Sequence, residues 1–289
     1  MIQCTMVNLK QLTLLIIIFI SFVIGYLFYS LNTIEKEKIV VNNLENALLT
    51  ASNLLEEEKK QALSFSMLLS NDKELLDAFI QNDRGKTFDI IQNKLIQLEM
   101  IQPKKFRIQI HDKDLNTYIR SWDFEKSGEK LESFRKGLVE VKNRQKPLVS
   151  IELGKRLNIK AISPIIQNEK FIGSIEVITE FETLANILRQ RGYELFVLLD
   201  DKYLDVAVDL MDNKKVKNYV LCNGIENLSL LNSLENINIK QLAEYGYIVN
   251  SHISLGYFSI YDINKQNLGY IIIATNSNLP MVLEKRGER

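Results

Sequence analysis

The sequence predicts an α+β membrane protein, in which one N-terminal transmembrane helix and a long stalk helix precede two modules built on antiparallel sheets. Three observations predict this fold. An uncharged apolar run lies near the N-terminus, and a helical pattern without proline or glycine follows it. The rest of the chain contains short runs in which apolar and polar residues alternate, separated by turn residues, as in antiparallel strands.

The composition narrows the classes of partner. The 289 residues include 36 Lys+Arg and 36 Asp+Glu, so the formal net charge is zero. Nucleic-acid binding requires a cationic surplus, so we expect no nucleic-acid partner. The two cysteines, Cys4 and Cys222, fall on opposite sides of the apolar run and cannot pair within one chain. They provide neither a disulfide framework nor a metal site, and we expect no metal and no cofactor.

The apolar run begins at Leu12 and contains no charged residue as far as Tyr29, which is long enough to cross a bilayer. A cleaved signal peptide is the alternative. The run is longer than a usual signal core, however, and no small-x-small cleavage site follows it, which favours an uncleaved anchor over residues 12–31. Lys10 precedes the run and no acidic residue does. We therefore expect residues 1–11 in the cytoplasm and the bulk of the chain outside a cytoplasmic (inner) membrane crossed once.

Residues 32–102 are predicted to form the stalk helix and a helical cap. No proline or glycine occurs from Thr33 to Leu69, and this helix would be roughly 55 Å long. Its apolar stripe comprises Val41, Leu44, Leu48, Ala51, Leu55, Ala62, Phe65 and Leu69. The stripe either packs on the protein's own modules or also pairs two copies in a homodimer. A helix start at residues 71–74, a break at 82–85 and a helix from Lys86 to Ile101 complete the cap.

Residues 103–181 are predicted to form a membrane-distal module. Apolar Phe106, Ile108 and Ile110 alternate with polar residues and predict a half-buried strand. The further elements are a strand at 116–122, a helix at 130–142, and strands at 148–153, 157–166 and 171–179.

Residues 182–276 are predicted to form a smaller membrane-proximal module, and residues 277–289 a C-terminal tail. A helix over 181–191, ended by Gly192, leads into the second module. The expected strands there are 194–199, 203–210, 218–221, 247–253, 256–261 and 268–275, with a helix near 239–244.

Motifs in the distal module carry a family resemblance. They are Arg120-Ser121-Trp122-Asp123, Gly128, Phe134-Arg135, Glu152-x-Gly154, Ile162-Ser163-Pro164 and Ile172-Gly173-Ser174-Ile175-Glu176. In this order and spacing the chain, over roughly residues 33–275, resembles the double Cache (dCache_3-like) sensors of bacterial chemoreceptors, histidine kinases and diguanylate cyclases. The resemblance implies two PAS-like Cache modules and a small organic ligand in the distal one. It also implies a role in signal transduction such as chemotaxis.

Five residues are candidates for contact with that ligand: Tyr118, Arg120, Trp122, Arg135 and Lys160. Strand alternation would place Tyr118, Arg120 and Trp122 on one face, where aromatic rings and a guanidinium suit a carboxylate. The alternative is that both aromatics are core residues and that Arg120 pairs with Glu152 or Asp123. Lys160 stands where the family often has arginine, and lysine loses the bidentate geometry for a carboxylate.

The sequence contains no GxSxG, HExxH, CxxC or phosphate-binding glycine loop, so we expect no enzyme activity in this chain. His111 and His252 are interpreted as turn or surface residues. A receptor of the resembled kind would re-enter the membrane after the last strand, but no second apolar run follows residue 276. Two alternatives to a receptor input module remain: a membrane-anchored interaction protein, and the sensor half of a split or truncated histidine kinase or diguanylate cyclase.

Overall fold

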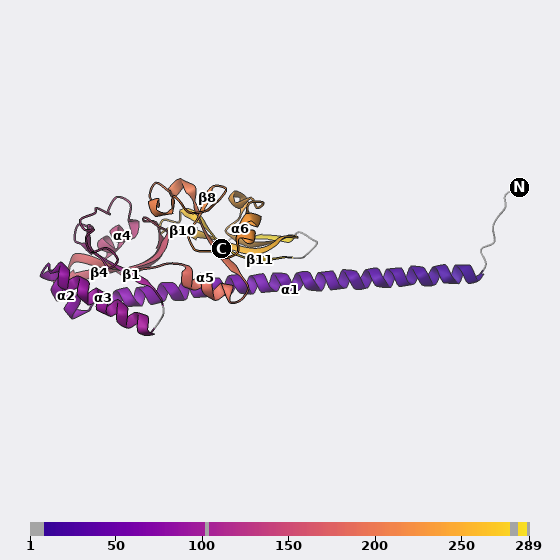
Figure 1. Cartoon of the computed structure of the whole chain (residues 1–289), viewed down its shortest axis with the longest axis horizontal. Helices are drawn as coiled ribbons and strands as arrows, with labels where there is room; N and C mark the ends of the chain where they lie inside the picture. Colours follow the sequence, from indigo (N-terminus) through magenta and orange to yellow (C-terminus); the bar gives the residue numbers. More distant parts are fainter. Residues whose placement is uncertain (1–8, 102–103, 278–282, 288–289) are drawn as a thin grey trace.

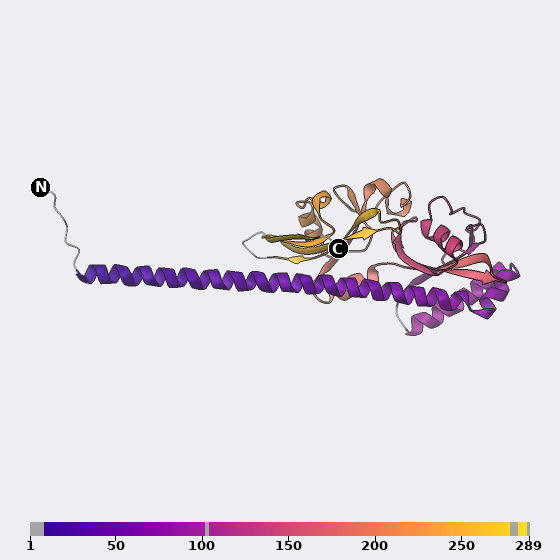
Figure 2. The ribbon, with the colours of Figure 1, turned by 180° about the vertical axis from the view of Figure 1, so that it is seen from behind.

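The structure is a computed structural model that describes residues 9–101, 104–277 and 283–287. One long helix runs beside two antiparallel sheets, which lie one after the other along it (Figures 1 and 2). The α+β architecture with two antiparallel sheets expected from the sequence is confirmed. The distal module lies at the far end of the helix, and the proximal module lies nearer to the N-terminus.

Helix α1 (Leu9–Ser70) joins the predicted membrane segment and the stalk in one unbroken helix of 62 residues. Its N-terminal part projects alone beyond both modules (Figure 1), and its most apolar 18-residue window has a mean hydropathy of 2.5 with no buried residue. By length and composition, this helix can cross a membrane. The first core residue along α1 is Leu44.

Beyond that point α1 packs on both modules. Its stripe from Leu44 to Leu69 lies against the two sheets. In the glutamate-lysine segment that follows Leu55, Glu56, Glu57 and Lys60 are exposed, Lys59 is partly buried and Glu58 is buried. The Glu58 carboxylate is buried and pairs with Lys104, which precedes the first strand. Ser66 and Ser163 also form a buried hydrogen bond of 2.8 Å between helix and sheet. Helices α2 (Lys73–Ile80) and α3 (Arg84–Ile101) form the cap, and Asp72 caps α2 by accepting from the Leu75 amide at 3.0 Å.

The distal sheet has the strand order β2-β1-β5-β4-β3, and every pairing is antiparallel. Its strands are β1 (Phe106–Asp112), β2 (Thr117–Arg120), β3 (Leu148–Glu152), β4 (Asn158–Gln167) and β5 (Lys170–Thr179). One face packs on α1, α2 and α3 through residues such as Ile108, Ile110, Ile175 and Val177. Helix α4 (Lys136–Arg144) lies over the other face. It begins six residues later than predicted, because residues 128–131 pair with the start of β2 instead.

The proximal sheet has the order β12-β9-β10-β11-β6-β8-β7. Its elements are α5 (Glu182–Arg189), β6 (Glu194–Asp200), β7 (Lys215–Val216), β8 (Tyr219–Leu221), α6 (Leu228–Leu234), β9 (Tyr245–Val249), β10 (Ile253–Tyr261), β11 (Asn267–Asn276) and β12 (Leu283–Gly287). One face packs on α1 and α5. The other is filled by apolar and aromatic side chains, including Tyr219, Tyr257 and Tyr270.

Several predictions for the proximal module are wrong. Residues 203–210 are not a strand; Asp201–Tyr203 and Val208–Leu210 form two 3-10 turns, which bury Ala207 and Leu210 in the core. The helix near residue 239 is a single 3-10 turn, and α6 was not predicted. Part of the expected tail forms β12, which pairs with β9 along the sheet edge.

Candidate ligand-binding site

The candidate site lies on the face of the distal sheet that points away from α1. Because side chains alternate along a strand, Ile108 and Ile110 point to α1, whereas Gln109 and His111 point to the other face. Glu176 of β5 and Lys160 of β4 lie on that same face. Segment 121–135 and α4 cover it, so the strand predicted to be half-buried is buried on both faces at Gln109 and His111.

A cavity of about 340 Å³ opens between this face, the covering segment and the turn that joins β3 to β4. Seven basic side chains line it: Arg107, Arg120, Lys126, Arg135, Lys155, Arg156 and Lys160. Three acidic side chains line it: Asp123, Glu129 and Asp209. The lining therefore carries more basic than acidic groups, although the chain as a whole is neutral.

Arg120, at the end of β2, is 6% exposed and pairs with Glu129. One of its terminal nitrogens also lies 3.4 Å from Thr117 Oγ1, and its Nε has no hydrogen-bond partner among the described residues. A buried guanidinium with an unused N–H can donate a further hydrogen bond to an anionic partner. Arg120 therefore pairs with neither Glu152 nor Asp123, the two partners considered from the sequence.

Trp122 follows Arg120 and forms a half-exposed wall of the cavity. Its side chain is 44% exposed, and its ring lies 5.7 Å from the guanidinium carbon of Arg107 and 5.9 Å from that of Arg120. The ring faces hold the two cations by cation–π attraction. Trp122 is thus a surface of the cavity rather than a core residue.

Tyr118 does not line the cavity, which corrects the expectation that it shares a face with Arg120. The register between β1 and β2 shifts after Ile110, so that His111 pairs with Thr117 and Tyr118 is the extra residue of a bulge. The Tyr118 ring turns to the face of the sheet that the helices cover. It packs edge to face on the Phe79 ring, with 4.9 Å between the ring centroids. Alternation fails here because one inserted residue reverses the side-chain parity of a strand.

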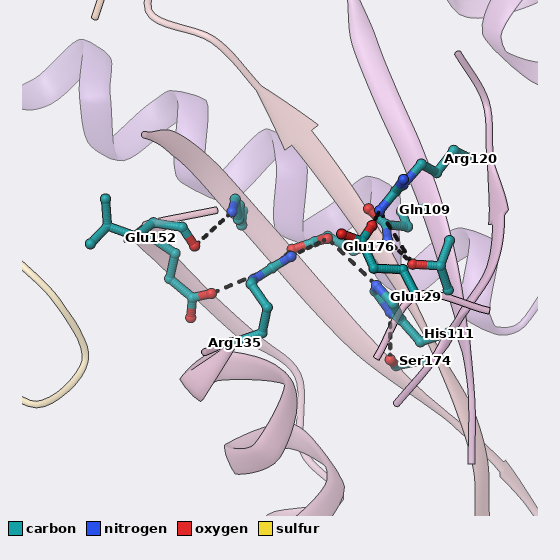
Figure 3. A network of polar contacts seen from close by, with 11 residues as sticks. Gln109, His111, Arg120, Glu129, Arg135, Glu152, Ser174 and Glu176 are labelled. Carbon is teal, nitrogen blue, oxygen red and sulfur yellow. Dashed lines mark hydrogen bonds and ion pairs between the residues drawn. The ribbon is translucent and has the colours of Figure 1, made fainter. Parts of the chain in front are cut away.

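Arg135 connects the cavity to a buried ion network (Figure 3). From the start of α4 it reaches Glu176, which it contacts through two nitrogens, and Glu152, 3.5 Å away. Burial disfavours the charge of Arg135, but the two carboxylates outweigh it and raise the pKa of the guanidinium. Burial likewise acts to raise the pKa of Glu176, yet Arg135 and Lys160 hold it below its usual range.

His111 completes this network and is fully buried, which corrects its interpretation as a turn or surface residue. Its Nδ1 lies 3.0 Å from Ser174 Oγ, and its Nε2 lies 3.7 Å from a Glu176 oxygen (Figure 3). Burial, outweighing the Glu176 charge, lowers the pKa of His111 to about 4. The ring is therefore neutral at neutral pH.

Lys160 lies on the cavity wall with 3% exposure, and its Nζ donates to the Leu153 carbonyl at 3.0 Å. Burial and the nearby charge of Arg135 lower the pKa of Lys160 to about 7. A Cβ at position 154 would lie 2.5 Å from this Nζ, so Gly154 gives the lysine room to approach the backbone. The Glu152-x-Gly154 motif thus positions one partner of Arg135 and accommodates Lys160.

Four of the five candidate residues, all except Tyr118, therefore line one cavity. The sequence interpretation missed Gln109, Thr117, Glu129, Lys155, Arg156 and Glu176. Alternation along β1 and the glutamate that ends the Ile172–Glu176 motif would have indicated part of this set. Glu129, Lys155 and Arg156 lie outside the helices and strands, where no periodic pattern predicts the direction of a side chain. Among the described residues, no group of three or more His, Cys, Asp and Glu could hold a metal ion.

Comparisons with known proteins give one family and one fold. A family described as the double sensory domain of two-component sensor kinases matches residues 38–278. Among solved structures, the extracellular domain of the putative histidine kinase vpHK1S-Z8 has 13% identity and a TM-score of 0.51, covering 83% of this chain and 92% of its own.

A domain of a putative sensory box/GGDEF family protein from Vibrio parahaemolyticus also has 13% identity, with a TM-score of 0.52 and coverage of 84% and 98%. The ligand-binding domain of the Campylobacter jejuni chemoreceptor Tlp3, in complex with L-valine, has 14% identity and a TM-score of 0.44, with coverage of 83% and 93%. No curated protein matches the chain.

Proposed function

Because this chain belongs to the family of double sensory domains of two-component sensor kinases, we propose that its distal module binds a small organic anion, a carboxylate, in the cavity beside Arg120. The observation that carries the proposal is the lining of seven basic and three acidic side chains around a buried arginine. Trp122 supplies an apolar wall for the organic part of the ligand. Lys160 and Arg135 lie further along the same wall.

The proposed signal route starts at this cavity and follows α1. Helix α1 packs on both sheets and continues without interruption into the apolar segment. A ligand that binds two arrangements of the modules unequally shifts the balance between them, and α1 carries the shift to the membrane. We place residues 1–11 in the cytoplasm and both modules outside it, in a receptor for chemotaxis or a related signalling pathway.

We further propose that two copies associate along α1. The side of the helix that faces away from the sheets exposes large apolar residues, among them Leu49 at 60% and Leu68 at 71%. Light scattering of the purified chain in detergent tests this proposal, and a monomer at micromolar concentration contradicts it. The alternative of an anchored interaction protein predicts capture of a specific protein partner without any small ligand.

Thermal unfolding of the full chain in detergent micelles tests the ligand. The panel contains mono- and dicarboxylates, amino acids and amines at matched ionic strength. A ligand at 100 times its Kd adds ~2.7 kcal/mol of stability. We expect stabilisation by carboxylates, its loss in Arg120→Gln, and its retention in Arg144→Gln, which removes an exposed arginine of α4. No shift with any carboxylate contradicts the proposal.

A further inference from the structure

The carboxylate of Glu129 occupies the part of the cavity where a ligand carboxylate would meet Arg120. It pairs with the Arg120 guanidinium, and its other oxygen lies 3.3 Å from Lys155 Nζ (Figure 3 shows the Arg120 pair). The side chain is 35% exposed, whereas Arg120 is buried. Burial acts to raise the pKa of Glu129, but Arg120 and Lys155 outweigh it and keep the group ionised at neutral pH.

The Glu129 backbone is held independently of its side chain. The Thr117 amide donates to the Glu129 carbonyl at 2.9 Å, and the Gly128 amide donates to the Thr117 carbonyl at 2.7 Å. Asn116 and Lys130 form the adjacent bridge. Rotation about the side-chain bonds can therefore move the carboxylate into solvent while the segment stays paired with β2.

We propose that Glu129 is an internal carboxylate that occupies the anion subsite, and that a ligand carboxylate binds to Arg120 by exchange with it. This inference rests on the proposed function. A tethered carboxylate has a high effective concentration, so a free ligand displaces it only if the ligand makes stronger or additional contacts with the basic side chains of the cavity. Ligands with two carboxylates, or with one carboxylate that engages Arg120 bidentately, satisfy this condition, and Glu129 thereby determines specificity.

The exchange also removes a partner from the turn that contacts the proximal module. Lys155, the second partner of Glu129, lies in the β3–β4 turn, and its carbonyl accepts from the Asp209 amide of the proximal module at 3.0 Å. Arg156, the next residue, donates to the Cys222 carbonyl at 3.2 Å. The turn that loses its Glu129 partner is therefore the turn that touches the second module.

Isothermal titration of the full chain in detergent with sodium succinate, at an ionic strength fixed with sodium chloride, tests the exchange. The critical variant is Glu129→Gln, which keeps the shape and removes the competing charge. Asp123→Asn is the matched control, because Asp123 lines the same cavity but pairs with Lys126 at 3.1 Å. This variant also removes one negative charge, but it leaves the pair between Glu129 and Arg120 in place. Glu132→Gln changes an exposed residue of the same segment. Trp122, the single tryptophan of the chain, gives a second readout by fluorescence.

We expect Glu129→Gln to lower the apparent Kd for succinate about tenfold, Asp123→Asn to lower it less than about threefold, and Glu132→Gln to leave it unchanged. Binding by Glu129→Gln alone, with none by the wild type, also supports the exchange. Equal effects of Glu129→Gln and Asp123→Asn overturn the exchange, because the overall electrostatic potential of the cavity then explains both effects. Weaker or unchanged binding in Glu129→Gln overturns it while the proposed function stands. Absence of binding in every chain overturns both.

Discussion

Two terminal nitrogens of Arg135 contact the two carboxylate oxygens of Glu176, although the two side chains are only 4% and 0% exposed. Burying both charges is costly, and the pair is tolerated because each partner compensates the other and Glu152 adds a second acceptor. Arg135 precedes α4 and Glu176 lies in the middle of β5. The pair therefore joins the start of α4 to the sheet beside the cavity.

Replacing Arg135 by methionine should destabilise the protein by about 3–5 kcal/mol, because Glu176 is left buried without its cation. Urea unfolding of the full chain in detergent measures this loss. The double variant Arg135→Met/Glu176→Leu should recover much of the stability, since an apolar pair leaves no orphaned charge. The control is Arg144→Met on the exposed side of the same helix. A single variant as stable as this control contradicts the prediction.

Lys160 should make the stability depend on pH above neutrality. Its folded-state pKa is about 7 against 10.5 for an ordinary lysine, so between these values the unfolded chain binds more protons than the folded chain. Stability therefore rises as the pH increases from about 7 to about 10 and falls as the pH decreases through 7. Unfolding free energies of the wild type and Lys160→Met measured across this range should differ in slope. The exposed Lys113→Met is the control, and identical slopes for all three chains exclude the effect.

Substitution of Trp122 tests whether this residue forms a wall of the cavity or contributes to the core. Because the ring is 44% exposed, Trp122→Leu should cost less than about 1.5 kcal/mol of stability, well below the loss at a buried tryptophan. The loss of its contacts to Arg107 and Arg120 should raise the Kd for a bound carboxylate about two- to fivefold. Unfolding and titration on the same sample measure both. A stability loss of several kcal/mol with unchanged affinity indicates a structural role instead.

The contact of α1 with the proximal sheet depends on Gly256. A Cβ there would lie 2.6 Å from Cγ of Leu48, so Gly256→Ala should cost about 1–3 kcal/mol through overpacking. The double variant Gly256→Ala/Leu48→Ala should lose less than the sum of the two single variants, because the smaller side chain makes room for the methyl group. Thermal unfolding of the four chains gives this coupling. Strict additivity contradicts the proposed contact.

Most of the distal module was predictable from its sequence, and the proximal module was predictable only in part. Strands such as β1 and β5 carry an apolar face that repeats every second residue, and this local pattern survives folding. The proximal turns at residues 201–210 contain as many apolar residues as a strand. The burial of Ala207 and Leu210 there depends on tertiary packing, which the local sequence does not specify. Strand β12 similarly depends on a partner, β9, that lies far away in the sequence.

The candidate site divides in the same way. The motifs indicated Arg120, Trp122, Arg135 and Lys160. The bulge in β2 turned Tyr118 away from the cavity, and no pattern in the sequence predicted that bulge. The sequence by itself determined the apolar span, the helix that continues from it and the alternating strands, because these depend on neighbours a few positions apart. Only the tertiary structure decided which charges share the buried face of the distal sheet. Glu129, Glu152 and Glu176 come from separate segments, and an ion pair between such segments forms only where folding excludes water from both partners.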